Sequence, residues 1–279
     1  MLDQTDEMTR RDYEYVRRLV YAQSGINLGE QKMQLVKSRL GKRVRDGGYG
    51  SFRAYFKHVE EDSTGEELCI LLDSISTNTT HLFRESQHFK LLGELIRAWA
   101  KEGRWRASGD ALRIWSAGCS SGEEPYSIVM EAHEALQQHS GVELKILATD
   151  LSVQMLSKAK LGEFEDHRVG TVPPTYRKQY LKPTSHDRSV LQVVPELRQK
   201  IKFARFNLMS STFPFKQGFD VIFCRNVMIY FDKKTQETLV NKFARHLNPG
   251  GYLMIGHSES LSGVEHPLKY VQPTVYRKD

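Results

Sequence analysis

The 279-residue sequence predicts an α/β protein in which a small α-helical domain precedes a doubly wound, mostly parallel sheet of Rossmann-like type. Three observations support this fold class. Residues 10–75 place apolar side chains at helical spacing and contain no alternating, strand-like run. From Leu112 onward, apolar runs of strand length alternate with helical segments. The first of these runs enters a turn with two glycines that opens a helix, as nucleotide-binding α/β sheets do.

Four helices are expected in the N-terminal part. They are Arg10–Gln23, ended by Gly25; Glu30–Arg45, ended by Gly47 and Gly48; a helix capped by Ser51; and Leu68–Ile75. A long fifth helix begins at Ser86 and leads to the first strand. We therefore divide the chain into a helical domain (residues 1–76), a linker (77–90) and a sheet domain (91–279).

The sheet domain is expected to alternate strand and helix. The strands are Leu112–Ala117, Leu144–Thr149, Ile201–Phe206, Phe219–Cys224, Tyr252–Ile255 and an edge strand Val271–Tyr276; the helices are Tyr126–Gln137, Val153–Lys160 and Lys234–His246, the last followed by a turn at Asn248–Gly251. Residues 164–200 are rich in proline and charge, and only Val190–Val194 looks like a strand. Because this segment is too long for an ordinary connection, we interpret it as a small inserted antiparallel β-subdomain, with a disordered loop as the alternative.

Composition narrows the class of protein. The formal net charge of +6 favours an acidic partner but does not demand nucleic acid. No apolar run is long enough to span a bilayer and the acidic N-terminus lacks a signal core, so we expect a cytoplasmic protein that does not insert into membranes. Cys69, Cys119 and Cys224 lie far apart without metal-ligand spacing, so neither a metal nor a disulfide is expected.

The turn after the first strand, Ser116–Gly122, is the strongest sign of a ligand. Gly118 and Gly122 leave the backbone open to a bound molecule. Ser120 stands where dinucleotide-binding turns carry a glycine against the pyrophosphate, which favours a nucleoside without phosphate, such as S-adenosylmethionine (SAM). Cys119 is interpreted as a small turn residue rather than a nucleophile, because no histidine motif accompanies it.

Two acidic residues complete this nucleoside-binding pattern. Asp150 ends the second strand, where a carboxylate suits ribose hydroxyls; a helix N-cap is the alternative. Glu123 suits the ammonium group of SAM, and complementing the N-terminus of the helix is its alternative.

Two further strings are dense in polar groups. Residues 76–85 read STNTTHLFRE, for which a capping and turn segment is the alternative to a binding role. Residues 219–231 read FDVIFCRNVMIYF and bring Arg225, Asn226 and Tyr230 to the carboxyl edge of the sheet, where ligands bind in open α/β folds. For Tyr230 an aromatic core position is the alternative. Residues 206–208 end at the same edge.

Together these strings resemble the chemotaxis receptor methyltransferases of the CheR family, in the same order and over nearly the whole chain. The resemblance implies transfer of a methyl group from SAM to glutamate side chains of bacterial transmembrane chemoreceptors, which serves sensory adaptation and leaves S-adenosylhomocysteine. By motif match the cofactor contacts would be Asn78, Thr80, Arg84, Glu123, Asp150, Asn207, Leu208, Arg225 and Asn226. Arg84 and Tyr230 would also face the methyl-transfer site as the candidate catalytic residues.

The resemblance also implies partners. Lys32, Arg39, Lys42 and Arg43 lie on a helix without acids between Lys32 and Arg45, and would dock the cytoplasmic methylation helices of the receptors; a solvated basic face is the alternative. In some members the β-subdomain binds the receptor's C-terminal tail peptide, but residues 182–189 lack the glycines of tail-binding members, which argues against it here. A monomer is the default for the family.

Two other functions remain open at this stage. One is a SAM-dependent methyltransferase of another acceptor such as RNA, although the basic helix lacks the aromatic residues that stack on bases. The other is a non-catalytic SAM-binding signalling adaptor, against which the presence of Arg84, Asp150 and Tyr230 counts. For a glutamate acceptor no general base is required, since a carboxyl with a pKa of about 4.3 is already ionised at neutral pH.

Overall fold

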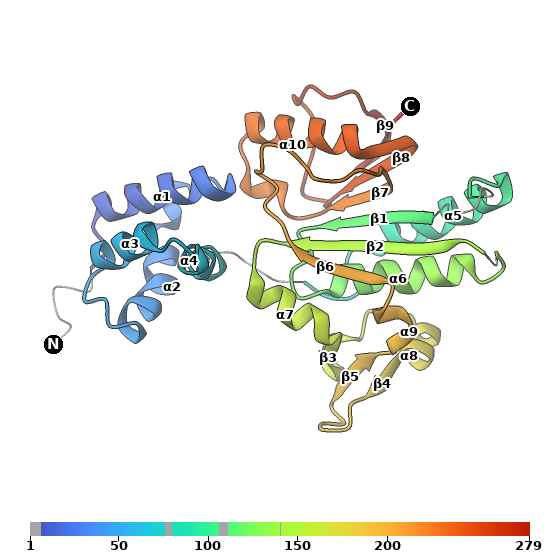
Figure 1. Ribbon diagram of the computed structural model, residues 1–279, viewed down its shortest axis with the longest axis horizontal. Helices are drawn as coiled ribbons and strands as arrows, with labels where there is room; N and C mark the ends of the chain where they lie inside the picture. The colour runs from blue at the N-terminus through green and yellow to red at the C-terminus, as the bar shows by residue number, and fades with distance from the viewer. Residues whose placement is uncertain (1–6, 76–79, 106–110, 140) are drawn as a thin grey trace.

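The computed structural model describes residues 7–75, 80–105, 111–139 and 141–279, arranged as a helical domain beside a sheet domain (Figure 1). The helical domain contains α1 (Arg10–Ser24), α2 (Met33–Asp46), α3 (Phe52–Glu61) and α4 (Glu66–Ile75). Gly25 ends α1 in the left-handed conformation and Ser51 caps α3 through its side chain, as the sequence predicts. The expected second helix differs at its start, because Glu30–Lys32 form a 3-10 turn before α2.

A seven-stranded sheet forms the second domain, in the order β6-β2-β1-β7-β8-β10-β9. The strands are β1 (Ala111–Ala117), β2 (Glu143–Asp150), β6 (Ile201–Arg205), β7 (Phe219–Cys224), β8 (Leu247–Ile255), β9 (Lys269–Gln272) and β10 (Val275–Arg277). β6, β2, β1, β7 and β8 run parallel, whereas β10 pairs antiparallel with both β8 and β9. The predicted mostly parallel sheet is therefore confirmed.

The end of the chain differs from the prediction of one edge strand at Val271–Tyr276. Thr274 has a positive φ of 65°, and the turn it makes with Pro273 separates β9 from β10. The two strands form a hairpin, so β10 lies inside the sheet and only β9 is at the edge. The turn expected at Asn248–Gly251 lies within β8, beside a shift in its register against β7.

Side chains of β1 alternate between the two faces of the sheet, and each face has its own core. Ile114 packs into the cluster that also holds residues of α5 (Gln87–Glu102), α6 (Glu123–Leu136) and α7 (Val153–Leu161). Its neighbour Trp115 packs into the cluster on the other face, under α10 (Lys233–His246). Helices thus cover both faces of the sheet (Figure 1).

The segment between α7 and β6 forms the predicted inserted antiparallel β-subdomain. Its sheet contains β3 (Glu163–Glu165), β4 (Leu181–Pro183) and β5 (Val190–Val193), with β5 in the middle, and it carries α8 (Pro174–Tyr180) and α9 (Pro195–Arg198). The sequence indicated only the central strand, since β3 and β4 are three residues long.

The helical domain packs beside the carboxyl ends of the parallel strands (Figure 1). The Tyr21 hydroxyl donates to Asp232 Oδ2 at 2.7 Å, and the Asn27 backbone N–H donates to the Tyr230 carbonyl at 2.8 Å. The edge of the sheet at which α/β folds bind ligands is therefore partly covered by the helical domain. None of the helices in the described part of the chain has the length and hydropathy to cross a bilayer.

Candidate functional site

A cavity of about 360 Å³ lies at the carboxyl edge of the sheet, within the usual size range of small-molecule sites. Part of its wall comes from the carboxyl ends of four parallel strands. These segments are residues 118–120 after β1, 150–151 at the end of β2, 206–208 after β6 and 225–227 after β7. Ser24 and Ile26 of the helical domain and Thr80, His81 and Arg84 of the linker close it from the other side. One pocket thus gathers residues from all three predicted divisions of the chain.

The glycines of the first turn serve backbone geometry and packing. Gly118 has a φ of 90°, and a Cβ there would lie 2.5 Å from Val227 Cγ2. Gly122 has a φ of 100°, and a Cβ would lie 3.0 Å from the Cα and Cβ of Ala159 in α7. Only Gly118 lines the cavity. The expectation that both glycines make room for a ligand is therefore wrong for Gly122, where the fit of α6 against α7 excludes a side chain.

Asp150 is fixed by two backbone donors. Its Oδ2 accepts from the Ser120 N–H at 2.7 Å and its Oδ1 from the Ser152 N–H at 2.9 Å. Burial raises the pKa of this carboxyl, although both hydrogen bonds oppose the shift. Ser152, and not Asp150, caps α7, so the N-cap alternative for Asp150 is wrong. The carboxylate keeps lone pairs for hydroxyl donors in the cavity.

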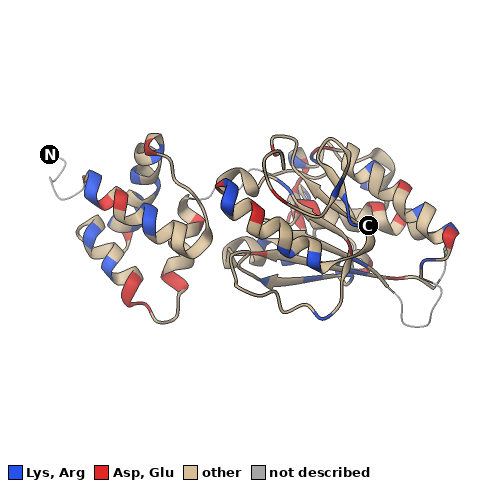
Figure 2. Cartoon of the chain, turned by 90° about the horizontal axis from the view of Figure 1, so that it is seen from above, with Lys and Arg blue, Asp and Glu red and all other residues tan. Residues whose placement is uncertain are grey.

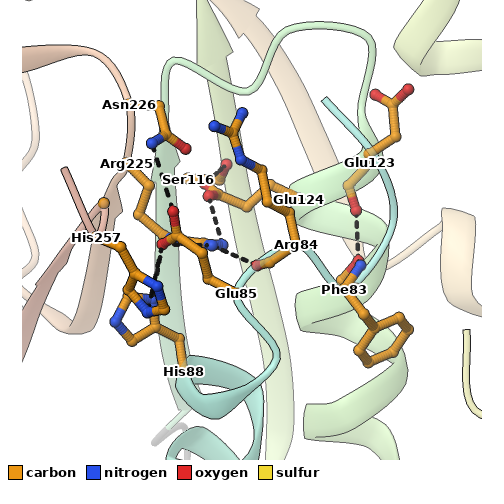
Figure 3. Close-up of polar contacts among 12 residues, drawn as sticks. Phe83, Arg84, Glu85, His88, Ser116, Glu123, Glu124, Arg225, Asn226 and His257 are labelled. Carbon is orange, nitrogen blue, oxygen red and sulfur yellow. Dashed lines mark hydrogen bonds and ion pairs between the residues drawn. The ribbon is translucent and has the colours of Figure 1, made fainter. Parts of the chain in front are cut away.

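The two adjacent glutamates of the turn point to different partners. Glu123 pairs with Arg168 at 2.8 Å and is absent from the residues that line the cavity, whereas Glu124 lines it. Figure 3 shows the Glu123 carboxylate directed away from Arg225. Glu124 is held by the Ser116 hydroxyl at 2.7 Å, and burial raises its pKa. The structure thus brings Glu124, rather than the predicted Glu123, to the site.

Arg225 joins the linker to the sheet (Figure 3). Its guanidinium contacts Glu85 Oε2 at 2.9 Å and Glu124 Oε2 at 3.2 Å, and also donates to the Arg84 carbonyl. Only 2% of the Arg225 side chain is exposed. The arginine therefore fixes the backbone of Arg84, a candidate catalytic residue, against the end of β7.

Strained backbone concentrates around this site. In the described chain five non-glycine residues have positive φ: Phe83, Glu85, Ser120, Asn226 and Thr274. Ser120 and Asn226 line the cavity, and Phe83 and Glu85 flank Arg84 in the linker. Such conformations cost about 1–3 kcal/mol each and cluster where a fold positions functional groups.

One polar atom in the cavity wall lacks a hydrogen-bond partner among the described residues. The Ser120 hydroxyl is buried and makes no hydrogen bond to any described residue. An unsatisfied buried hydroxyl costs about 1–3 kcal/mol. Together with the Asp150 and Glu124 carboxylates, this hydroxyl suits a ligand that carries hydroxyl and ammonium donors.

Most of the predicted cofactor residues converge here. Thr80, Arg84, Asp150, Asn207, Leu208, Arg225, Asn226 and Tyr230 all line the cavity, while Asn78 lies outside the described residues. The Asn207 amide is already engaged, since Nδ2 donates to the Gln23 carbonyl at 2.6 Å and Oδ1 accepts from the Met209 N–H. That side chain connects the two domains.

Sequence reasoning missed several residues of the wall. His81 is among them, and burial lowers its pKa, as do Arg84 and Arg225, so its imidazole is neutral near pH 7. Cys119 also lines the cavity, and burial raises its thiol pKa well above the ordinary value, consistent with a turn residue rather than a nucleophile. Glu85, which pairs with Arg225 outside the wall itself, was part of the polar string but carried no assigned role.

The predicted docking residues divide into two groups. Arg43 makes a bidentate pair with the buried Glu67, and Arg39 Nη1 donates to the Ile75 carbonyl at 2.9 Å. Lys42 is exposed, and Lys32 places its ammonium 5.4 Å from the centre of the Tyr230 ring. Figure 2 shows Lys and Arg spread over the helices of this domain, interspersed with acids. Docking by these residues stays a prediction.

Comparisons with known proteins agree with this geometry. Residues 78–277 match the family model described as CheR methyltransferase, SAM binding domain, and residues 11–76 match CheR methyltransferase, all-alpha domain. The chain is 40% identical over 273 residues to the chemotaxis protein methyltransferase of Borreliella burgdorferi, covering 98% of this chain and 95% of that protein. It is 39% identical to chemotaxis protein methyltransferase 2 of Pseudomonas aeruginosa (96% and 93% covered). It is 34% identical to the Escherichia coli chemotaxis protein methyltransferase (99% and 94%). The resemblance drawn from the sequence is confirmed: the chain belongs to the CheR methyltransferase family.

Proposed function

We propose that this protein transfers a methyl group from SAM to glutamate side chains of chemoreceptors, forming methyl esters that adjust sensory signalling. The observation that carries the proposal is the cavity at the carboxyl edge of a SAM-binding family domain, in which Asp150, Glu124 and Arg84 meet. The names of the relatives, chemotaxis protein methyltransferases, support the same process.

The residues of the cavity fit SAM. Asp150 would accept hydrogen bonds from the ribose hydroxyls, and Glu124 would face the ammonium or sulfonium charge. The Ser120 hydroxyl, which lacks a partner in the described chain, supplies a further donor or acceptor. When bound, SAM supplies a methyl group on a positively charged sulfur, which is its own leaving group.

Catalysis by this chain then rests on orientation. The acceptor carboxylate is ionised at neutral pH, so no residue has to remove a proton from it. The protonated Cys119 agrees with a site that uses no thiolate. Arg84 and Tyr230 would hold the carboxylate in line with the methyl group, and such alignment is worth about 7–11 kcal/mol at best. An arginine that bound the carboxylate tightly would stabilise the ground state, so we assign Arg84 an orienting role.

Receptor recognition is assigned to α2 and the 3-10 turn before it. Lys42 on α2 and Lys32 in the turn are the candidates whose ammonium groups face solvent or the rim of the cavity, and Arg39 lies between them in the sequence. Glutamate-bearing helices are acidic, so these cations would steer them toward Tyr230. The expectation that the β-subdomain does not bind a receptor tail peptide stays a prediction, and so does the monomeric state.

The test is methyl transfer from tritium-labelled SAM to receptor-containing membranes. The label is expected on the receptor and is expected to be released by alkali, because carboxyl methyl esters hydrolyse there and N-methyl groups do not. Label on RNA, or alkali-stable label on protein, would contradict a glutamate acceptor.

Two variants test whether Arg84 and Tyr230 take part in methyl transfer. Tyr230→Phe removes one hydroxyl that would contact a charged acceptor, so turnover should fall by about 10- to 100-fold while the affinity for S-adenosylhomocysteine, measured by calorimetry, stays within about threefold. Tyr21→Phe is the matched control, because that hydroxyl bonds Asp232 outside the cavity. Arg84→Ala should also lower turnover. Normal turnover in both site variants would remove Arg84 and Tyr230 from the reaction.

A further inference from the structure

The linker and the segment after β8 bring three potential metal ligands together beside the cavity. Glu85, His88 and His257 each offer one ligand atom, and these atoms lie within 4.8 Å of one another. His88 Nδ1 is 3.6 Å from Glu85 Oε2, and His257 Nε2 is 3.9 Å from the same oxygen. Figure 3 shows both imidazole rings beside the Glu85 carboxylate.

A hydrogen bond at Nε2 sets the tautomer of His88. His88 Nε2 lies 2.7 Å from Thr274 Oγ1, and the Thr274 hydroxyl donates its own proton to the Pro273 carbonyl. Thr274 Oγ1 is therefore the acceptor of an Nε2–H bond, and His88 Nδ1 carries a lone pair. An outer hydrogen bond of this kind fixes ligating histidines in metal sites.

The lone pair of His88 is buried without a partner. Only 2% of the side chain is exposed, and Nδ1 makes no hydrogen bond to any described residue. It faces a carboxylate oxygen, which is also an acceptor.

The surrounding charge favours an added cation. Glu85 and Glu124 both contact Arg225, and Glu259 accepts backbone N–H bonds from Asn226 and Gly256 beside it. Two carboxylates thus contact the Arg225 guanidinium, and a third, that of Glu259, is held by the neighbouring backbone. A divalent ion would balance the remaining charge. Arg225 would then be the outer hydrogen-bond donor that orients the ligating carboxylate.

We propose that Glu85, His88 and His257 form a binding site for a divalent transition metal, with Zn²⁺ the best match to two imidazoles and one carboxylate. Tetrahedral zinc with bonds of about 2.0–2.2 Å separates its ligand atoms by roughly 3.3–3.5 Å, so the 3.6 and 3.9 Å separations need only small adjustments. His257, whose side chain is 50% exposed, gives the ion access from solvent and leaves a fourth position for water.

The site would act on the methyltransferase through Glu85. The Asn226 amide approaches Glu85 Oε1 at 3.5 Å, and Arg225 bridges Glu85 to the backbone of Arg84. A bound ion would therefore lock the linker against the end of β7. The residues of the metal site themselves are absent from the wall of the cavity.

The test is calorimetric titration of the untagged, chelator-stripped full chain with Zn²⁺, repeated with Co²⁺ as a spectroscopic probe. One ion per chain is expected, with the intense visible absorption of tetrahedral Co²⁺. His257→Ala should weaken binding by about 100-fold or more, and Thr274→Ala, which removes only the outer hydrogen bond, by about 10- to 100-fold. Folding of each variant is checked by circular dichroism.

The matched control is His186→Ala. His186 lies 3.7 Å from Glu163 on the surface of the β-subdomain, a histidine–glutamate pair outside the three-residue cluster. Its removal should leave the affinity for Zn²⁺ unchanged. Failure of the parent chain to bind one ion, or equal affinity in His257→Ala and the parent, would overturn the proposal. Neither result would bear on methyl transfer, which is tested separately.

Discussion

Arg43 in the helical domain and Arg225 in the sheet domain both pair with carboxylates, but their surroundings differ. Among the described residues Arg43 forms an ion pair only with Glu67, and 32% of the arginine side chain is exposed. Arg225 is 2% exposed and contacts both Glu85 and Glu124. The Arg43 pair is balanced in charge, whereas the Arg225 cluster has excess negative charge beside a cavity.

This difference separates a structural ion pair from a functional one. The Arg43 contact lowers the pKa of Glu67, so both charges are stabilised where they are. Burial raises the pKa of Glu124 despite the opposing contact with Arg225, so its charge is costly until a cation joins it. A buried cluster with unbalanced charge is thus the better sign of a ligand.

The largest effect is expected from Arg225→Met. This change leaves Glu85 and Glu124 buried without their cation, and the free energy of unfolding should fall by about 3–5 kcal/mol. Arg43→Met leaves only one carboxylate, that of Glu67, without its cation and should cost about 1–3 kcal/mol. Urea denaturation measures both. Equal losses of unfolding free energy would show that the two arginines contribute equally to stability.

The pH dependence of stability should differ in sign between the two regions. Because the folded pKa of Glu124 is raised, its charge destabilises the fold, and stability falls as pH rises from the unfolded value through the raised one. Because the folded pKa of Glu67 is lowered, its pair stabilises above the unfolded pKa, and this stabilisation is lost as pH falls through the folded one.

Glu124→Gln and Glu67→Gln therefore provide a paired test. Relative to the parent chain, measured from pH 3 to 8, the first variant should gain stability as pH rises above about 4.5, and the second should lose stability as pH rises toward about 4.5 from below. Each change should be about 1.4 kcal/mol for each unit of pKa shift removed. Urea unfolding across this range gives both slopes. Slopes of the same sign would refute the contrast.

A smaller effect is expected from two cations of the helical domain, the half-buried Lys32 in the turn before α2 and the exposed Lys42 on α2. Lys32→Glu and Lys42→Glu should each lower kcat/KM for receptor methylation by about five- to tenfold, less at high salt, because long-range steering is screened. The affinity for S-adenosylhomocysteine should be unchanged. Lys158→Glu, an exposed charge on α7, is the control. If the control and the two lysine variants behave alike, α2 and the turn before it do not dock the receptor.

The smallest effect should come from Arg43→Lys. A lysine keeps the charge opposite Glu67 and loses only the bidentate geometry, so stability should fall by about 1 kcal/mol or less. Arg225→Lys should cost clearly more, since one ammonium cannot reach Glu85, Glu124 and the Arg84 carbonyl together. Thermal unfolding of the two lysine variants measures both losses of stability. Comparable losses would contradict the difference between the Arg43 and Arg225 sites.

The sequence predicts the alternation of strands and helices well, because buried parallel strands read as continuous apolar runs. It also predicts which residues reach the cavity, since the carboxyl ends of parallel strands meet at one edge; Asp150, Leu208 and Asn226 are examples. The hairpin of β9 and β10 was missed because the turn depends on Thr274 adopting a positive φ, which is rare for a β-branched residue.

Other features depend on contacts that no local pattern encodes. Glu123 and Glu124 are adjacent on the first turn of α6, and only the position of Arg168 and Arg225 decides which of them faces the cavity. His257 meets Glu85 and His88 through the packing of α5 against the end of β8, across more than half of the chain. Ser24 and Ile26 enter the cavity wall through the docking of the two domains.

That shared wall makes the two domains one thermodynamic unit. A ligand that contacts both Ser24 and Asp150 stabilises the packing of the helical domain against the sheet. By reciprocity, anything that shifts the helical domain changes the affinity for that ligand. A chimaera carrying the helical domain of a relative is therefore expected to bind the methyl donor with a changed affinity.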